Sequence, residues 1–194
     1  DNRQTVNIQF SDGVNTYTYA TDKTISELKP GYTIPFLIDM DEVDYIGKQL
    51  SGRECYVKTS IWYDEAEQMI GGRKFVKVHI DGVKPGNKVF PIKVNFTDVE
   101  SGKKAMLWMT TGGTVLKNRS FDALFSLTDV RLRYPNISDK VWSCIVAGKV
   151  QVGMTKDEVR LSIGAPNSIN ERPTHSGVRE YWYYGNGQYL YFED

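Results

Sequence analysis

The sequence predicts an α+β protein of two domains, and three observations lead to this prediction. Alternating apolar and polar stretches, separated by Gly- and Pro-containing turns, fill residues 1–135, as in a small antiparallel barrel or sandwich. Helix start and stop signals replace this pattern after Tyr134-Pro135. Two aromatic stretches around an Asn-Gly pair close the chain, a strong hairpin signal. We therefore expect an antiparallel β-rich domain, a small barrel or sandwich, over residues 1–135. A second domain of two helices and a three-stranded meander is expected over residues 136–194.

Length and composition exclude several classes of protein. A chain of 194 residues can bury a core without disulfides or metals. Lys plus Arg equals Asp plus Glu at 24 each, so no basic stripe marks a nucleic-acid partner. No run approaches the roughly 18 apolar residues that span a bilayer. Because the sequence begins at Asp1, we expect that a signal or anchor segment was removed upstream.

The two cysteines are far apart in the sequence. Cys55 and Cys144 lack C-x-x-C spacing and have no His neighbours, which excludes the usual zinc and redox motifs. We expect buried thiols, and a single bridge between the two residues is the alternative.

The first domain begins with a hairpin. Residues 5–20 alternate around Asp12-Gly13, which supplies the turn. Pro91 indicates an edge strand or a bulge where it lies. Further strands are expected over residues 33–38, 53–63, 73–81, 89–97 and 104–111.

Two short helices open the second domain. In the first, Ser138 is the expected N-cap and Gly148 the stop. In the second, Thr155 caps and Glu158, three residues on, completes a capping box. A helix of about two turns is marginal alone because nucleation is costly, so these local signals matter.

The second helix also carries a complete stop signal. Gly164 is expected as the left-handed residue after the helix, and Pro166 prevents the helix from resuming. Met154 precedes the cap and forms a hydrophobic staple with Val159.

The closing hairpin is aromatic on both faces. If Asn186-Gly187 are the two turn residues, residues 178–184 pair with residues 188–193. One face then carries Trp182, Tyr184, Tyr189 and Tyr191. The other carries Tyr181, Tyr183, Leu190 and Phe192. Helices need cover only one face, so we take the first four residues as partner-binding candidates. Packing of that face against the N-terminal domain is the alternative, and it is slightly favoured.

The last 59 residues, 136–194, resemble the BamE/SmpA/OmlA family of small bacterial envelope lipoproteins. The shared features are the Gly-Met-Thr helix start, the Gly-x-Pro helix stop, a Trp-x-Tyr strand and a closing aromatic strand. Here they correspond to Gly153, Met154, Thr155, Gly164, Pro166, Trp182, Tyr184, Tyr189, Leu190 and Phe192. The resemblance implies the family fold, which is similar to that of secreted β-lactamase-inhibitor proteins. Residues 1–135 resemble, far more weakly, small barrels of the Src-homology-3 type.

Catalysis is not indicated. His79 lies on the polar side of an alternating strand and His175 in a polar loop, and no known catalytic or nucleotide-binding motif accompanies them. Residues 39–44 are rich in Asp and Glu but lack the glycine and final glutamate of a calcium loop. We expect a solvated acidic turn there, and we predict no catalytic residue, metal or cofactor.

The expected function is that of a non-catalytic binding or scaffold protein of the bacterial envelope. The resemblance implies a lipid-anchored protein in the periplasm or at the outer membrane that docks on an envelope protein complex. One alternative is a secreted or anchored enzyme inhibitor that inserts the loop of residues 172–177 into an enzyme cleft. The other is a glycan- or cell-wall-binding protein that uses the first domain.

Overall fold

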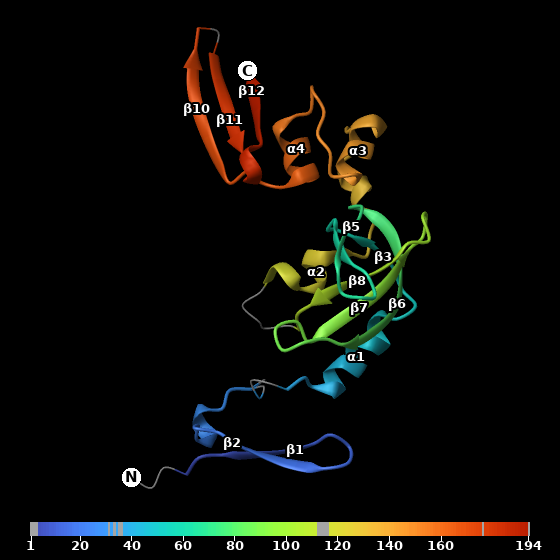
Figure 1. Ribbon diagram of the computed structural model, residues 1–194, viewed down its shortest axis with the longest axis vertical. Coiled ribbons are helices and arrows are strands. Elements are labelled where there is room, and N and C mark those ends of the chain that lie inside the picture. Colours follow the sequence, from blue (N-terminus) through green and yellow to red (C-terminus); the bar gives the residue numbers. More distant parts are fainter. Residues whose placement is uncertain are drawn as a thin grey trace.

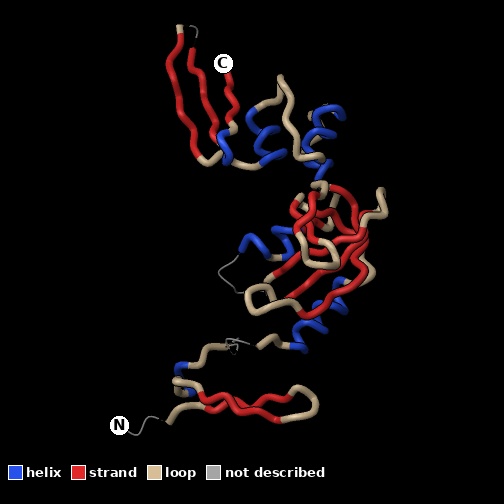
Figure 2. Tube along the Cα trace, in the orientation of Figure 1, coloured by secondary structure: helices blue, strands red, loops and turns tan. Residues whose placement is uncertain are grey.

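The described residues form an elongated molecule with three antiparallel sheets. The computed structural model describes residues 4–30, 32, 34, 37–111, 117–175 and 177–193. A two-stranded hairpin, a seven-stranded central sheet and a three-stranded sheet follow one another along the long axis (Figure 1). The α-helices lie beside the central and C-terminal sheets, and only a short 3₁₀ helical segment lies beside the hairpin in the described residues (Figure 2). The predicted α+β class is confirmed.

The N-terminal hairpin forms as predicted. Strands β1 (Asn7–Ser11) and β2 (Thr16–Ala20) pair antiparallel. Asp12 orders the turn because its Oδ1 accepts hydrogen bonds from the N–H groups of Val14 and Asn15, at 2.9 and 2.8 Å. These bonds lower the pKa of Asp12 to about 2. A 3₁₀ turn, η1 (Ile25–Glu27), follows.

Residues 37–50 differ from the expectation. The predicted strand over residues 33–38 falls partly outside the described residues, and its described end is not a strand. The expected acidic turn is instead the start of helix α1 (Met40–Leu50). Asp39 caps this helix by accepting from the N–H groups of Asp41 and Glu42. The acidic residues therefore lie at the positive end of the helix dipole, where they are stabilising.

The central sheet has the strand order β5-β4-β8-β7-β6-β3-β9. Its strands are β3 (Glu54–Val57), β4 (Ile61–Tyr63), β5 (Met69–Gly71), β6 (Val76–Pro85), β7 (Ile92–Asp98), β8 (Lys104–Met109) and β9 (Phe125–Ser126). The sheet is open, so the expected barrel does not close. Its edge strands β5 and β9 are only three and two residues long and offer few backbone groups for a closing ladder.

Several strand limits in the central sheet also differ from the prediction. The expected strand over residues 53–63 is divided into β3 and β4 by a bend at Thr59 and Ser60, where the Ile61 N–H donates to Thr59 Oγ1 at 3.2 Å. Pro91 precedes β7 rather than lying within it.

Three short helical segments complete the described part of this region: η2 (Lys117–Arg119), α2 (Phe121–Leu124) and η3 (Val130–Arg133). The core lies between the sheet and α1, and includes Val57, Trp62, Val78, Ile80, Ile92, Val94, Phe96, Leu107 and Phe125.

The C-terminal unit, residues 139–193, has the predicted order of two helices and a three-stranded meander. Its elements are α3 (Asp139–Val146), α4 (Lys156–Ile163), β10 (Ser168–Thr174), β11 (Gly177–Tyr183), the 3₁₀ turn η4 (Gly185–Gly187) and β12 (Tyr189–Glu193). Ser138 caps α3 as predicted, by accepting from the Val141 N–H. Cys144 on α3 is half-buried and Cys55 is buried, and both thiols are free. Burial raises the pKa of Cys55 to about 12.

The predicted capping signals of α4 are confirmed. The Glu158 N–H donates to Thr155 Oγ1 at 3.2 Å, and the Thr155 N–H donates to a Glu158 carboxylate oxygen at 2.7 Å. Met154 is buried with Val159. Gly164 ends the helix as expected, but as the C-cap, with φ +90° and ψ −176°, an extended glycine conformation and not the left-handed helical one that the sequence predicts. Gly153 lies at a φ of +89°, so the Gly-Met-Thr start also needs its glycine.

Candidate functional site

The turn between β11 and β12 determines which side chains face outward. The Tyr184 N–H donates to the Gln188 carbonyl at 2.9 Å, and Gly187 has a φ of +73°. Three residues therefore form the turn, with glycine in the left-handed position, which is a known alternative to the two-residue turn. Trp182 consequently pairs with Leu190, and Tyr181 with Tyr191.

The expected pairing was therefore wrong by one residue. A two-residue turn at Asn186-Gly187 would have placed Trp182 opposite Tyr191. A shift of one residue moves every side chain of a strand to the opposite face. The observed register places Leu190 and Phe192 beside Trp182 in the second core of the molecule, whose buried residues are Ile145, Met154, Val159 and Trp182. It leaves the β12 tyrosines outside, where their hydroxyl groups reach water.

Trp182 is a core residue, not an exposed one. Its exposed fraction is 0%. The Arg160 guanidinium of α4 lies 4.4 Å from the ring centroid, and the indole N–H donates to Glu180 at 2.9 Å. Lys156 bonds to the same carboxylate at 2.8 Å and, together with the indole N–H, lowers the pKa of Glu180.

Tyr184 also faces the helices. Its hydroxyl donates to the carbonyl of Gly164 at 3.2 Å, at the end of α4. Burial raises the pKa of Tyr184. The Trp-x-Tyr pair therefore holds the meander against α4. The four partner-binding candidates do not share a face, and only Tyr189 and Tyr191 point outward.

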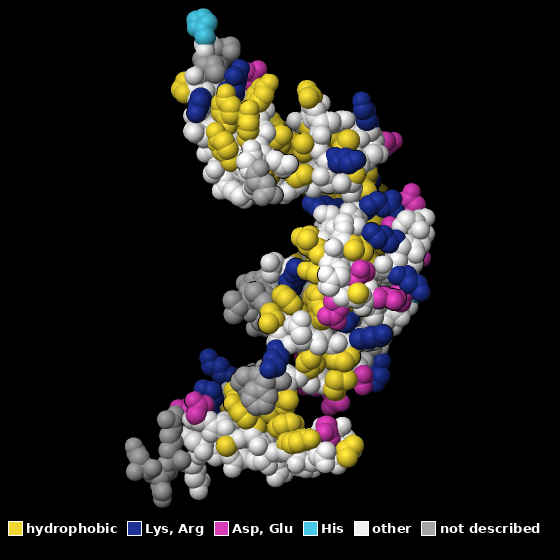
Figure 3. Space-filling model, in the orientation of Figure 1, with side chains coloured by type: hydrophobic (Ala, Val, Ile, Leu, Met, Phe, Trp, Pro, Cys, Tyr) yellow, Lys and Arg dark blue, Asp and Glu magenta, His cyan; other side chains and the backbone are white. Residues whose placement is uncertain are grey.

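The outward face of the C-terminal sheet carries a cluster that we call the tyrosine face. It consists of Tyr181, Tyr183, Tyr189 and Tyr191. Tyr181 lies 6.4 Å from Tyr189 and 6.3 Å from Tyr191 between ring centroids. Tyr189 and Tyr191 each have an exposed fraction of 59%. Hydrophobic side chains, a class that includes tyrosine in this view, are exposed over the C-terminal sheet with basic side chains beside them (Figure 3).

Two arginines accompany the tyrosine face. The Arg172 guanidinium lies 5.3 Å from the Tyr181 ring centroid, and that of Arg179 lies 5.4 Å from Tyr191. Arg179 also forms an ion pair with Glu193. Tyrosine and arginine are enriched at protein interfaces, and they dominate the binding energy there.

Sequence reasoning missed Tyr181, Tyr183 and both arginines as site residues. A signal for the correct faces was present in the sequence YLYFE of β12. Leu190 and Phe192, which have no polar group, alternate with tyrosines that do. The purely apolar pair should face the helices, so the tyrosines of the strand should face solvent.

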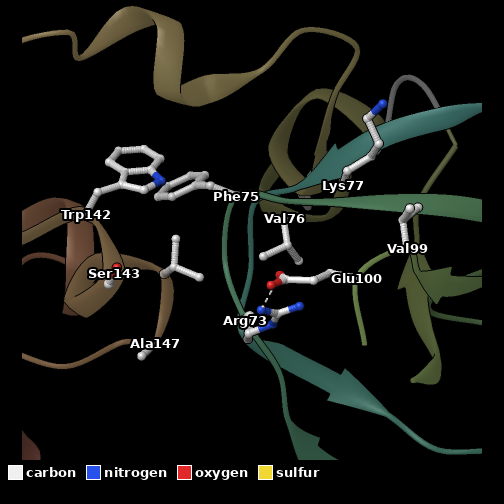
Figure 4. A pocket seen from close by; sticks show the side chains of 10 residues that line it. Arg73, Phe75, Val76, Lys77, Val99, Glu100, Trp142, Ser143 and Ala147 are labelled. Carbon is white, nitrogen blue, oxygen red and sulfur yellow. Dashed lines mark hydrogen bonds and ion pairs between the residues drawn. The ribbon is translucent and has the colours of Figure 1, made fainter. Parts of the chain in front are cut away.

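A cleft lies between the central sheet and α3. Its volume is about 610 Å³. Phe75 stacks on Trp142 of α3 with centroids 5.6 Å apart, and the ion pair of Arg73 with Glu100 lies on the other side (Figure 4). Arg73 also pairs with the buried Asp98 at 2.7 Å.

The cleft marks the joint between the central sheet and the C-terminal unit. Phe75 has a φ of +57°, an unusual conformation for a bulky residue. The neighbouring Lys74 donates from its N–H to the Val146 carbonyl at 3.0 Å, and from Nζ to the Ser162 carbonyl at 2.6 Å. Burial lowers the pKa of Lys74. Lys74 thus joins the two parts, whereas the ion pairs of Arg73 with Asp98 and Glu100 lie within the central region.

The two histidines lie apart from the tyrosine face and from each other. His79 is exposed on β6 opposite Glu54 and Thr97, and His175 is exposed in the turn after β10. Among the described residues, no group of three or more His, Cys, Asp or Glu side chains could hold a metal ion. Likewise, none of the helices in the described parts of the chain is long and apolar enough to cross a membrane.

Comparisons of the chain with protein-family models, with curated proteins and with solved structures found no match.

Proposed function

We propose that this protein is a non-catalytic binding module of the bacterial envelope that docks on a partner protein through its tyrosine face. The observation that carries the proposal is a sheet with one covered face and one aromatic face. Trp182 on the inner side is buried against α4, whereas Tyr189 and Tyr191 on the outer side are largely exposed. Ring contacts between the four tyrosines stabilise the sheet, but they leave much of the tyrosine surface in contact with water.

The chemistry of the face favours a protein partner. Tyrosine offers a large rigid contact area with two rotatable side-chain bonds, so its ordering on binding costs little entropy. Arg172 and Arg179 lie against tyrosine rings and add hydrogen-bond donors at the same surface. Small-molecule sites are usually concave, whereas these residues belong to the outer side of a sheet. A protein surface is therefore the occupant that fits best.

The BamE-like arrangement and the envelope location are parts of this proposal. Their support is the order of α3, α4 and the meander, together with the Gly-Met-Thr start and the Gly-x-Pro stop that frame α4. The contact of Tyr184 with Gly164 gives the Trp-x-Tyr and Gly-x-Pro motifs a common physical role, because one fastens the other. We propose a lipid-anchored protein in the periplasm or at the outer membrane on this basis.

Cross-linking and capture from detergent-solubilised envelopes of the source test the docking surface. The test variant replaces Tyr181, Tyr189 and Tyr191 with Ser. The matched control is Tyr45→Ser, which changes an exposed tyrosine on α1, far along the chain from the face. We expect one partner protein to be recovered with the wild type and with the control, and to be lost with the test variant. Cross-links should map to β11 and β12.

Equal recovery by the test variant and the control would contradict docking through the tyrosine face. Cross-links from the turn between β10 and β11 into an enzyme cleft would favour the inhibitor function instead. Recovery of glycan fragments without a protein partner would favour cell-wall binding by the central sheet.

A further inference from the structure

The two edges of the C-terminal sheet differ in their backbone groups. The hydrogen bond from the Tyr184 N–H to the Gln188 carbonyl shows that the backbone groups of these two residues face each other at the end of the β11–β12 ladder. Because backbone groups of a strand point alternately to its two sides, Leu190 and Phe192 direct theirs toward β11 in the observed register. The N–H and C=O groups of Tyr189, Tyr191 and Glu193 therefore point to the free edge of β12.

The opposite edge, formed by β10, is protected. The same alternation in the β10–β11 register directs the backbone groups of Ile169, Glu171 and Pro173 to that edge. Pro173 has no N–H to donate, and Glu171 places a charge on the inner side of the edge strand. Proline and inward-pointing charges are devices that prevent edge-to-edge pairing of sheets.

The β12 edge has no such protection. Among the described residues, no hydrogen bond reaches the outward N–H or C=O groups of Tyr189 and Tyr191. The strand contains no proline, and its inner side carries only Leu190 and Phe192, both partly exposed. An unpaired strand with an apolar inner side is a template for the addition of another strand.

We infer that the β12 edge pairs with the β12 edge of a second copy of this chain. In an antiparallel pairing centred on Tyr191, residue 189 of one copy lies opposite residue 193 of the other. Every outward N–H and C=O of the strand then finds a partner, which no other antiparallel register of the strand with itself achieves. The inference concerns the backbone edge and does not depend on docking through the tyrosine face.

Side chains and charge also fit a second copy. The register centred on Tyr191 places Leu190 of one copy opposite Phe192 of the other on the inner side, an apolar pair. Glu193 meets the uncharged Tyr189, so no like charges are opposed. The formal net charge of the chain is zero at pH 7, so the copies do not repel each other at long range. The pairing would join the two tyrosine faces into one continuous surface.

The test uses proline at a position where it removes only the edge donor. Because the Tyr191 N–H points away from β11, Tyr191→Pro leaves the β11–β12 ladder bonds in place and imitates Pro173 on the other edge. The matched control is Tyr191→Thr, which also loses the tyrosine ring but keeps the N–H in a β-branched residue. Sedimentation velocity over micromolar to millimolar concentrations measures the association of the full chain.

We expect the wild type and Tyr191→Thr to approach twice the monomer mass of 22.1 kDa as concentration rises. Tyr191→Pro should associate at least about tenfold more weakly than Tyr191→Thr, a difference of about 1.4 kcal/mol. In the wild type, hydrogen exchange at the amides of Tyr189 and Tyr191 should slow with increasing concentration.

A wild type that stays monomeric at every concentration would overturn the inference. Association of Tyr191→Pro equal to that of Tyr191→Thr would do the same, provided that circular dichroism shows both variants folded. If the proline variant does not fold, hydrogen exchange of the wild type provides the test. A wild-type dimer in which the amides of Tyr189 and Tyr191 exchange as fast as in the monomer would exclude pairing at this edge.

Discussion

The central sheet and the C-terminal sheet are both antiparallel, but they bury their strands to different extents. In the central sheet, β7 buries every second residue from Ile92 to Asp98, and β8 buries all residues from Ala105 to Met109. In the C-terminal sheet, Trp182 is the one buried strand residue among the described side chains. The first sheet is held by many contacts, and the second depends on one tryptophan and on local helix signals.

This difference accounts for the surface that the C-terminal unit offers. A sheet covered on one face by two short helices can leave its second face free, provided that its few core residues are large. Trp182 meets that requirement, since it contacts α4 through Arg160 and packs on Phe192 with ring centroids 4.7 Å apart. The small size of this core and the exposure of the tyrosine face therefore have the same cause, which is that helices cover only one face of the sheet.

The largest expected effect is that of Trp182→Ala. Removal of a buried tryptophan costs about 3–5 kcal/mol, and the second core has few other buried residues to compensate. We expect hydrogen exchange, followed by mass spectrometry, to show loss of protection over α3, α4 and the meander while β6 to β8 stay protected. The control is Tyr181→Ala on the outward side of the same strand, which should leave protection unchanged. Loss of protection in both sheets together would mean that the two parts unfold as one.

The sequence predicts those elements whose signals are local. The caps at Ser138 and Thr155, the stop at Gly164 and the turn at Asp12 each involve residues within a few positions of one another, and all four are found as expected. The start of α1 at Asp39 carried a similar capping signal, but the acidic residues that follow it were interpreted as a solvated turn.

Features that depend on distant contacts were predicted poorly. The pairing of β3 with the short strand β9 joins residues far apart in the sequence, such as Val57 and Phe125, which no local pattern shows. The face of Tyr189 depends on whether the turn at Gly185–Gly187 has two or three residues, and both turns suit an Asn-Gly pair. Packing of Leu190 against the second core favours the longer turn. Of the four candidate residues, Tyr189 and Tyr191 therefore face outward, whereas Trp182 and Tyr184 face the helices.

A moderate effect is expected for Asp98→Asn in the central sheet. Asp98 has an exposed fraction of 1% and accepts hydrogen bonds from Arg73, Ser101 and two backbone N–H groups. Burial alone would raise the pKa of Asp98, but these bonds outweigh it and the pKa is lowered. Loss of hydrogen bonds to a charged group should reduce the free energy of unfolding by about 1.5–3 kcal/mol near pH 7.

The pH dependence of this effect has a defined sign. Because the pKa of Asp98 is lower in the folded state, its carboxylate stabilises the fold fully above the unfolded-state pKa of about 3.9. That contribution is lost as pH falls through the lower folded-state pKa. Urea unfolding at several pH values should show the wild type and Asp98→Asn converging in acid. A difference between them that stays constant with pH would contradict the role given to the carboxylate.

The smallest effect is expected for Thr155→Ala, and it tests the dependence of the C-terminal unit on local signals. The substitution removes the acceptor for the Glu158 N–H and should lower the free energy of unfolding by about 1 kcal/mol. Thr155→Ser keeps the hydroxyl and serves as the control. The loss should appear in the urea midpoint of the C-terminal unit, followed by tryptophan fluorescence, and not in the exchange of β7 amides. If the midpoint does not move, the cap is dispensable, and tertiary contacts such as those of Trp182 and Tyr184 hold α4 in place without it.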